Sequence, residues 1–453
     1  MTVDWPIQST IPGAEWPAVV PRGADATLAL LFQLERTQWL PLARLRELQL
    51  RQLAATLRHA YATVPHYRER WQDIFDPAQT LTDERIAALP LLARRELQQR
   101  FNALTSNDIP AAHGAVGESR TSGSTGAPVR VLKTQMSTLM WNALTLRDHI
   151  WHGRDLAAKL AAIRHGVTPG TFDNWGQATE NLVTTGPSVV RGIEQDAASQ
   201  LEWLARENPD YLITHPSMAA ELARLSLERG VRLPRLHEVR TYGELLTPEA
   251  RALCREAWAV PVTDTYSSNE VGYIALQCPR HEHYHVQSES LLVEVLDERG
   301  GACAPGEVGR IVVTTLHNFA MPLVRYELGD YAEVGAACDC GRGLPVLRRI
   351  IGRVRNMLVT ATGQRYWPAL GLRALMDVAP ILQYQLVQKD FERVVAKLVT
   401  TSKLAPAQEE EVRRAILARL PNGLQLSFEY CDGIPRSAGG KYEDFVSEVG
   451  SAR

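Results

Sequence analysis

A short segment rich in hydroxyls and glycine is the part of the sequence best suited to bind phosphate. It consists of Thr121, Ser122, Gly123, Ser124, Thr125 and Gly126. Hydroxyl and backbone N–H groups packed this closely can surround phosphate oxygens, and glycines let the backbone approach the ligand. Arg120 and Lys133 flank the segment. Because it lacks the lysine pattern of a Walker A loop, it indicates a phosphate loop of another kind, with a plain surface loop as the alternative.

A second group of residues has the side chains of a metal site. Residues 278–281 form a Cys-x-x-His pair with two further histidines close behind, and residues 338–340 form a Cys-x-Cys pair. Three thiolates and one imidazole suit tetrahedral Zn²⁺, and a site made only of protein ligands is structural. Free thiols and surface histidines are the alternative. The predicted ligands are Cys278, Cys338, Cys340 and either His281 or His285.

Helices and strands that would position these groups follow from hydrophobic spacing. Residues 25–75 and 83–101 place apolar side chains three or four apart, which predicts helices, the second interrupted at Pro90. Short β-rich runs then alternate with apolar helical segments, as at 211–214 and 260–263. This alternation favours an α/β core.

The second half of the chain changes character. Residues 285–330 favour strands, the clearest being 291–296 and 310–315, with turn residues at 297–301 between them. A smaller mixed α and β unit is expected from about residue 354 to the end. We therefore predict an N-terminal domain over 1–353, with a zinc-pinned β subdomain around 278–340, and a smaller C-terminal domain over 354–453.

Composition restricts the class of protein. The 453 residues include 49 Lys and Arg and 51 Asp and Glu, a formal charge of −2, with 45% hydrophobic residues. These values are typical of a globular protein and exclude a disordered chain, a collagen and a disulfide scaffold. Near-neutral charge favours neither nucleic acid nor an anionic membrane as partner. No export signal or apolar stretch of ~18 residues is present, so a cytoplasmic protein is expected.

Several segments, taken in order, resemble the adenylate-forming ligase superfamily, which includes acyl-CoA synthetases and adenylation domains. The phenylacetate-CoA ligase-like branch is the most similar, and the resemblance covers nearly the whole chain. Besides the 121–126 loop, the similar segments are 60–70 (AYATVPHYRER), 89–97 (LPLLARREL), 242–246 (YGELL), 266–270 (YSSNE), 326–330 (YELGD), 352–356 (GRVRN) and 435–441 (PRSAGGK).

The resemblance implies roles for individual residues around ATP and Mg²⁺. Lys441 would bridge the substrate carboxylate and the α-phosphate, and Glu270 would carry Mg²⁺ beside the phosphates. Tyr266 would pack on the adenine, while Asp330 and Arg353 would fix the ribose. The turn that borders the adenine would hold Gly243 and Glu244.

Departures from the family pattern are small. Ser267 and Asn269 replace Gly and Thr but remain small and polar, and Gly439 replaces Ser in the lysine loop. Arg355 and Asn356 replace acidic residues of the interdomain hinge, about which the family rotates its C-terminal domain. In some members of the branch a histidine lies further from the first cysteine, which favours His285 as zinc ligand, whereas simple spacing favours His281.

The acyl pocket is expected between the helix after the phosphate loop and the turn near residue 243. Trp141 and Trp175 would suit an aromatic or flat apolar acid, and Arg164 or His165 could meet a polar substituent. These aromatic residues are equally consistent with a place in the core.

The predicted function is ATP-dependent activation of a small carboxylic acid to an acyl-adenylate, followed by transfer to CoA. The first alternative keeps adenylation but transfers the acyl group to a carrier-protein thiol or an amine. Two other classes are a phosphotransferase, which lacks a Walker lysine in its favour, and a zinc-pinned binding protein without activity. The presence of Glu270, Asp330 and Lys441 together disfavours the last class.

Overall fold

The computed structural model describes residues 7, 9–13, 17–121, 128–180, 182–353, 356–366, 368, 375–376, 378–437 and 440–449. Ser122, Gly123, Ser124, Thr125 and Gly126 of the predicted phosphate loop lie outside the described residues, as does the predicted hinge residue Arg355.

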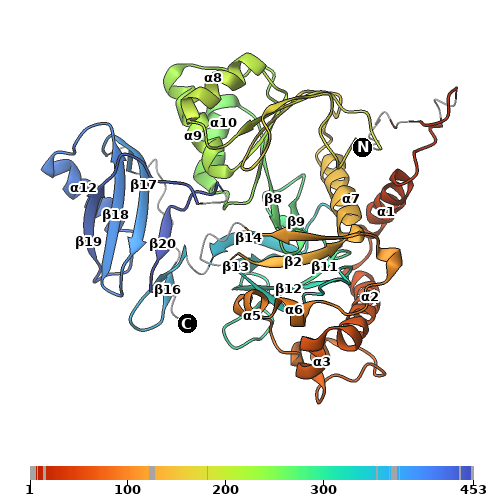
Figure 1. The fold of residues 1–453 in the computed structure, drawn as a ribbon. Helices are drawn as coiled ribbons and strands as arrows, with labels where there is room; N and C mark the ends of the chain where they lie inside the picture. Colours follow the sequence, from red (N-terminus) through yellow and green to blue (C-terminus); the bar gives the residue numbers. More distant parts are fainter. Residues whose placement is uncertain are drawn as a thin grey trace.

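Helices occupy the segments where helical spacing predicted them, beginning with three in succession near the N-terminus (Figure 1). Their bounds are α1 (Ala24–Thr37), α2 (Leu42–Thr63), α3 (Pro65–Trp71), α4 (Asp83–Ala88), α5 (Arg94–Gln99), α6 (Phe101–Leu104), the 3-10 helix η1 (Ala111–His113), α7 (Gln135–Trp151), α8 (Ala197–Glu207), α9 (Pro216–Arg229), α10 (Pro248–Trp258) and α12 (Pro406–Leu417).

Strands form four sheets in the described part of the chain. Their bounds are β1 (Val116–Arg120), β2 (Arg130–Thr134), β3 (Leu160–Arg164), β4 (Gly170–Phe172), β5 (Ser188–Gly192), β6 (Tyr211–Thr214), β7 (Glu238–Tyr242), β8 (Val262–Ser268), β9 (Gly272–Gln277), β10 (Tyr284–Val286), β11 (Leu291–Leu296), β12 (Val308–Thr315), β13 (Tyr326–Val334), β14 (Val346–Arg353), β15 (Leu358–Val359), β16 (Arg365–Tyr366), β17 (Ile381–Gln388), β18 (Arg393–Thr400), β19 (Gln425–Tyr430) and β20 (Phe445–Ser447).

One large sheet joins an α/β half to an antiparallel half. Its order is β11-β12-β13-β14-β10-β9-β8-β7-β6-β3-β5-β4. The run β5-β3-β6-β7-β8 is parallel, and the crossover helices α8, α9 and α10 connect its strands. All four residues of β6 are buried, as expected for a strand inside a parallel sheet. The predicted α/β core is present.

Local sequence explains where the crossover helices begin. The Asp196 carboxylate accepts the Ser199 N–H at the start of α8, and the Thr247 hydroxyl accepts the Ala250 N–H at the start of α10. Pro248 fills the first position of α10, where a missing N–H has no cost. The Thr247 cap fixes the point at which α10 begins, and residues 243–246 form the turn between β7 and this cap.

The antiparallel half packs on the N-terminal helices. Its strands β8 to β14 share one apolar core with α2 and α3, in which Trp71, Tyr67 and Tyr326 are among the largest fully buried side chains. β11 and β12 pair across the turn predicted at 297–301. The junction of the two halves, where β7, β8, β13 and β14 come together, holds the residues described below.

The C-terminal part forms its own small sheet. Strands β19, β18, β17 and β20 lie side by side with α12, to one side of the large sheet (Figure 1). They enclose a separate apolar core that includes Tyr384, Val394 and Phe445. The domain boundary at residue 353 stays a prediction.

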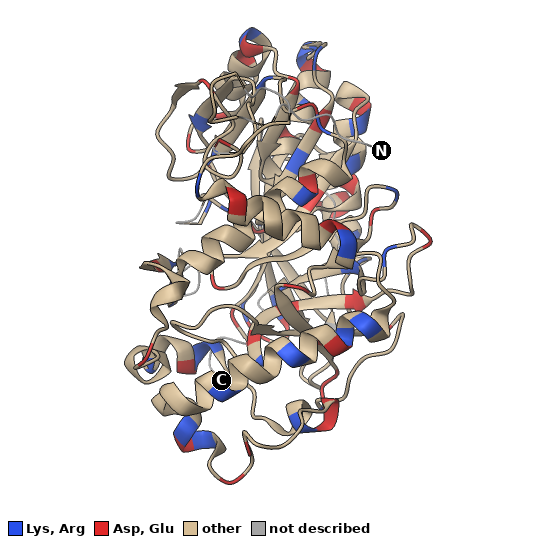
Figure 2. Ribbon diagram, turned by 90° about the vertical axis from the view of Figure 1, so that its right-hand side faces the viewer, with Lys and Arg blue, Asp and Glu red and all other residues tan. Residues whose placement is uncertain are grey.

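Charge is spread evenly over the molecule. On the face seen in Figure 2, basic and acidic residues alternate along the helices, and no area of one sign dominates. None of the helices in the described residues is both long enough and apolar enough to span a lipid bilayer. The cytoplasmic location stays a prediction.

Candidate active site

Three strands, β8, β13 and β14, bring the predicted ribose-binding residues and Tyr266 together. Asp330 in β13 faces Arg353 in β14 as a register pair, and their side chains form an ion pair at 3.3 Å. The Tyr266 hydroxyl of β8 donates a hydrogen bond to Asp330 Oδ2 at 2.7 Å. Burial, together with the Asp330 charge, raises the pKa of Tyr266 well above its usual range, so the phenol stays a donor. Each oxygen of the buried Asp330 carboxylate is therefore held by one neighbour, Oδ1 by Arg353 and Oδ2 by Tyr266.

Glu270 lies in the turn between β8 and β9 and is almost completely buried. Arg94 of α5 forms an ion pair with Glu270 Oε1 at 2.9 Å, and its other nitrogen reaches Thr121 Oγ1 at 3.4 Å. A carboxylate beside a phosphate loop is the type of ligand that Mg²⁺ takes in nucleotide sites. The chemistry of these residues therefore fits a Mg²⁺ ion at Glu270, which would neutralise charge on the phosphates.

Thr121 closes the base of the predicted phosphate loop. Its N–H donates to Val129 O at 2.9 Å, and its hydroxyl accepts the Val129 N–H, also at 2.9 Å. These two bonds join Thr121, at the end of β1, to Val129, just before β2. The loop therefore begins next to Arg94 and Glu270.

The C-terminal segment brings Lys441 to the same place. A Cβ added at Gly243 would lie 3.7 Å from Lys441 Cε and 3.1 Å from the His215 ring, and Gly243 itself has φ +81°. Glycine is therefore required where the turn after β7 meets the lysine. Burial lowers the pKa of Lys441 to about 8, with the Arg353 charge adding to the effect and the carboxylates of Asp330, Glu244 and Glu270 opposing it.

Glu244 fastens the C-terminal loop to this turn. Its two carboxylate oxygens accept the Ser217 N–H at 3.0 Å and the Tyr442 N–H at 2.7 Å. Arg436 adds a hydrogen bond to Ser217 Oγ at 2.7 Å and lies 3.5 Å from Glu244 Oε1. Glu244 was predicted to border the nucleotide, and in the structure its carboxylate joins the turn after β7 to the loop that carries Lys441.

A cavity of about 290 Å³ opens beside Glu270. Trp141 of α7 lines it and stacks on Tyr273 of β9 with ring centroids 4.1 Å apart. Lys133 of β2 also lines this cavity. The acyl pocket was expected between α7 and the turn near residue 243; this cavity has α7 as one wall, but its other walls come from the turn after β8 and from β12, and no residue of the 243–246 turn lines it.

The other predicted pocket residues lie away from this cavity. Trp175 donates its indole N–H to Ala158 O at 2.9 Å and packs edge-on against Tyr211. The Arg164 guanidinium lies 5.2 Å from the centroid of the Tyr242 ring. His165 pairs with Glu194 at 2.6 Å, next to Gly440 of the lysine loop. Their roles in substrate binding stay predictions.

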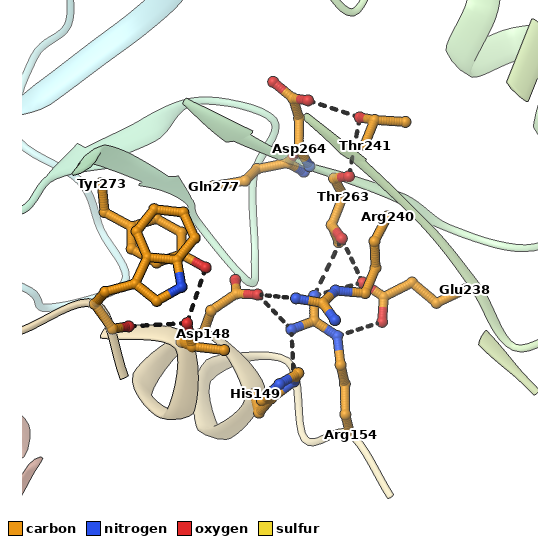
Figure 3. A network of polar contacts seen from close by, with 12 residues as sticks. Asp148, His149, Arg154, Glu238, Arg240, Thr241, Thr263, Asp264, Tyr273 and Gln277 are labelled. Carbon is orange, nitrogen blue, oxygen red and sulfur yellow. Dashed lines mark hydrogen bonds and ion pairs between the residues drawn. The ribbon is translucent and has the colours of Figure 1, made fainter. Parts of the chain in front are cut away.

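A buried network of charges positions α7 against the parallel strands (Figure 3). Arg154 forms ion pairs with Asp148 of α7 at 2.6 Å and with Glu238 of β7 at 2.7 Å. Arg240 of β7 reaches the same Asp148 oxygen at 3.0 Å. All of these side chains are buried, so the pairs work at low dielectric. The network therefore fixes α7, the helix that carries Trp141, relative to β7, the strand that ends just before Gly243.

The predicted zinc ligands form a compact cluster. Donor atoms of Cys278, His283, His285 and Cys338 all lie within 4.8 Å of one another, and Cys340 Sγ lies 3.4 Å from His285 Nε2. His283 Nε2 and His285 Nδ1 are buried and have no hydrogen-bond partner. Soft sulfur donors beside unpartnered imidazoles fit Zn²⁺.

His281 lies outside this group of buried donors. Its Nε2 lies 2.5 Å from Asp339 Oδ1 at the surface. Of the two histidines left open by the sequence, the structure therefore favours His285 as the ligand. Spacing along the chain did not single out His283. A metal here would join the β9–β10 turn to the connection between β13 and β14.

The sequence did not predict a role in the site for Arg94, Ser217 or Arg436. Arg94 falls inside the family-like segment 89–97, so comparison of that segment was the signal that could have found it. Ser217 begins α9 and contacts Glu244 only through the fold.

The chain is similar to known ligases over most of its length. A family model of the CapK C-terminal domain matches residues 372–448. The chain is 26% identical over 455 residues to a phenylacetate-coenzyme A ligase of Thermus thermophilus, covering 91% of this chain and 98% of that protein. It is 25% identical to the Pseudomonas putida enzyme of the same name over 439 residues, with 92% and 96% covered.

Solved structures show the same fold. That of 2-hydroxyisobutyryl-CoA ligase in the postadenylation state, in complex with 2-HIB-AMP, superposes with a TM-score of 0.73 at 19% identity, covering 91% of this chain and 92% of that one. The same ligase in the thioesterification state gives a TM-score of 0.60, with 92% of each chain covered. The predicted fold, a large α/β part followed by a small C-terminal part, is confirmed.

Proposed function

We propose that this chain, a relative of the phenylacetate-CoA ligases with the fold of the adenylate-forming ligases, activates a small carboxylic acid with ATP and transfers it to CoA. The resemblance indicated by its sequence motifs is confirmed by these relatives. The enzyme class, an ATP-dependent ligase that releases AMP, follows from the same relatives. The identity of the acid and the choice of CoA as acceptor are the parts of the proposal that go beyond these relatives.

The first step makes a mixed anhydride. A substrate carboxylate oxygen forms a bond to the α-phosphorus of ATP, and the bond from that phosphorus to the bridging oxygen breaks, so that pyrophosphate leaves. Negative charge is spread over the phosphate oxygens in the transition state, so fixed cations and N–H donors lower the barrier most. Lys441 is the cation proposed to hold the carboxylate and the α-phosphate together.

One observation carries this proposal. Lys441 comes from the last part of the chain, yet it is buried beside Gly243 and within the field of Asp330, Glu244 and Glu270. Burying an ammonium group costs free energy unless anions compensate for it. A lysine placed among the predicted ribose, magnesium and adenine residues is the arrangement that adenylation requires.

The remaining site residues have supporting roles. Asp330 would accept the ribose hydroxyls, with Arg353 and Tyr266 fixing its carboxylate. Glu270 would hold Mg²⁺, and Arg94 would orient Glu270 toward the phosphate loop that starts at Thr121. The stacked rings of Trp141 and Tyr273 support a flat acid in the adjacent cavity.

The second step replaces AMP with a thiol. The CoA sulfur would attack the acyl carbonyl, forming a thioester while the bond to the AMP oxygen breaks. CoA is proposed as acceptor because the full-length relatives carry it in their names. We also propose that Cys278, His285, Cys338 and either Cys340 or His283 hold a structural Zn²⁺.

Acid-dependent exchange of labelled pyrophosphate into ATP tests the first step. Purified protein would be incubated with ATP, Mg²⁺ and a panel of aryl and alkyl acids. Exchange with some acids and not others is expected. Formation of ADP and a phosphorylated acid would instead identify a phosphotransferase, and silence across the panel would favour a binding protein.

Addition of acceptors then tests the second step. With the best acid, CoA should increase the release of AMP and form one thioester for each AMP. If a simple amine or a carrier-protein thiol releases AMP while CoA does not, the acceptor assignment is wrong and the adenylation assignment stands.

A further inference from the structure

The cavity beside Glu270 has one flat aromatic wall and one polar wall. The aromatic wall is the stacked pair Trp141 and Tyr273. Polar side chains of the lining include Lys133, Asn142, Gln177, Ser290, His317 and Asn318. A pocket meant for an apolar acid would contain few such groups. This lining points to an acid that is flat but carries a polar substituent.

Lys133 is the positive charge of this lining. It lies in β2 opposite Gly117, and its side chain is mostly buried, which lowers the pKa of its amine. Among the described residues, no carboxylate lies within ion-pair distance of Lys133. Glu270, the acidic residue of the lining, is already paired with Arg94 at 2.9 Å.

The other titratable groups of the lining supply no negative charge. His317 Nε2 lies 2.9 Å from Glu289 O, and burial lowers the pKa of its ring, so it stays neutral near pH 7. Burial raises the pKa of Tyr273, so its phenol also stays neutral. The cavity therefore contains a cation without a matching anion. Because an unpaired buried ammonium is unfavourable, a ligand that supplies the anion gains affinity from it.

Lys133 and Lys441 are two separate cations. The charges that act most on Lys441 are those of Arg353, Asp330, Glu244 and Glu270. Glu270 is the charge that acts on Lys133, which lies in the β1–β2 hairpin. A diacid could thus offer one carboxylate to Lys133 and keep its reacting carboxylate for Lys441.

We propose that the acid activated here carries a second anionic group, such as a second carboxylate, which forms an ion pair with Lys133 while its ring or flat chain lies against Trp141. This inference rests on the proposed function and names its substrate class. The volume of about 290 Å³ lies at the small end of ligand sites, which limits the acid to about one ring.

Matched acids test the proposal. Benzoate would be compared with benzene-1,3- and benzene-1,4-dicarboxylate, and short-chain monoacids with the diacids of equal length, in the pyrophosphate exchange assay. In the parent protein kcat/KM should favour a diacid over its monoacid about 10- to 100-fold, the value of one buried charged hydrogen bond. Equal use of both members of every pair would overturn the proposal.

Lys133→Met removes the charge and keeps the length of the side chain. The preference for the diacid should disappear, with the monoacid changed by less than about threefold. Arg130→Met is the matched control, since Arg130 lies in the same strand but is exposed and paired with Glu118. If Lys133→Met instead raises the KM for ATP equally with all acids, Lys133 serves the phosphates and the proposal is wrong.

A binding measurement keeps this test independent of turnover. Calorimetric titration of the same acids into the protein with AMP present needs no catalysis. Tighter binding of a diacid that is lost in Lys133→Met supports the inference even if no acid supports exchange, in which case the proposed adenylation fails by itself. Equal affinity of mono- and diacids in the parent contradicts the inference whatever the exchange assay shows.

Discussion

The Glu244 carboxylate accepts the backbone N–H of Tyr442 at 2.7 Å, and so ties the turn after β7 to the residue that follows Lys441. Its other oxygen accepts the Ser217 N–H at 3.0 Å, so one carboxylate joins the start of α9 to the C-terminal loop. Glu244 therefore acts on the chemistry through the position of Lys441.

Glu244→Gln should slow adenylation and spare the second step. The amide can accept one of the two N–H groups but presents its own NH₂ to the other, and the ion pair with Arg436 is lost. We expect pyrophosphate exchange to fall about 10-fold, the effect of one lost charged hydrogen bond. Thioester formation from supplied acyl-adenylate should change little, because it does not need Lys441 in the site.

The control for this variant is Glu411→Gln, an exposed residue of α12. It should leave both half-reactions unchanged. Equal loss of both half-reactions in Glu244→Gln would mean that Glu244 supports the fold or the nucleotide and has no special effect on docking.

Metal analysis should find about one zinc per chain. Cys338→Ser and His285→Ala should lose the metal, whereas His281→Ala should keep it, because His281 pairs with Asp339 outside the cluster. Removal of the metal should lower the unfolding temperature by roughly 5 °C or more, since the ion joins two distant segments. Cys431→Ser, far along the chain, is the control for loss of a thiol.

If the purified parent protein contains clearly less than one metal ion per chain, the zinc proposal is wrong. Metal retained in His285→Ala but lost in His281→Ala would reverse the choice between the two histidines. Neither result would affect the assignment of Lys441.

Much of this architecture could be predicted from the sequence. The strands at 211–214 and 291–296 have the bounds that their apolar runs indicated. All four residues of the first are buried, as in a strand inside a parallel sheet, and the second has buried residues at both of its ends. Asp330 and Arg353 were named from motifs, and β-sheet register makes them neighbours.

Other relationships depend on contacts between distant segments and carry no local signal. Arg94 meets Glu270 across 176 positions of sequence, and only the packing of α5 on the large sheet reveals the pair. In the sequence Lys133 flanks the predicted phosphate loop, but in the structure β2 places its side chain in the lining of the cavity. Trp141 and Trp175 were indistinguishable as sequence, yet one lines the cavity and the other packs in the core.

Asp148→Asn should destabilise the protein strongly. The substitution keeps the shape but leaves Arg154 and Arg240 buried with one negative charge fewer. Breaking a buried pair in this way costs about 3–5 kcal/mol of the free energy of unfolding. Urea denaturation measures this cost, and Asp73→Asn at an exposed position provides the control.

A change of less than about 1 kcal/mol in Asp148→Asn, the range of surface pairs, would show that water reaches the network. In that case α7 would be held mainly by apolar packing.

The pH dependence of exchange should report Lys441. Its pKa is lowered to about 8, so the charged amine is present below that pH and is lost as the pH rises through it. We expect kcat/KM for the acid to fall above about pH 8. In Lys441→Arg, whose guanidinium stays charged, any residual activity should lack this descending limb. If the fall in kcat/KM above about pH 8 is unchanged in Lys441→Arg, the titration of another group causes it.

We propose that Lys441 promotes formation of the bond between the substrate carboxylate and the α-phosphate, and the variant Lys441→Ala removes this cation. Acid-dependent exchange of pyrophosphate into ATP should fall by about 100-fold or more, the scale for loss of a charge that stabilises the transition state. ATP should still bind to the variant, and thioester formation from supplied acyl-adenylate should persist. Undiminished exchange in Lys441→Ala would contradict the account.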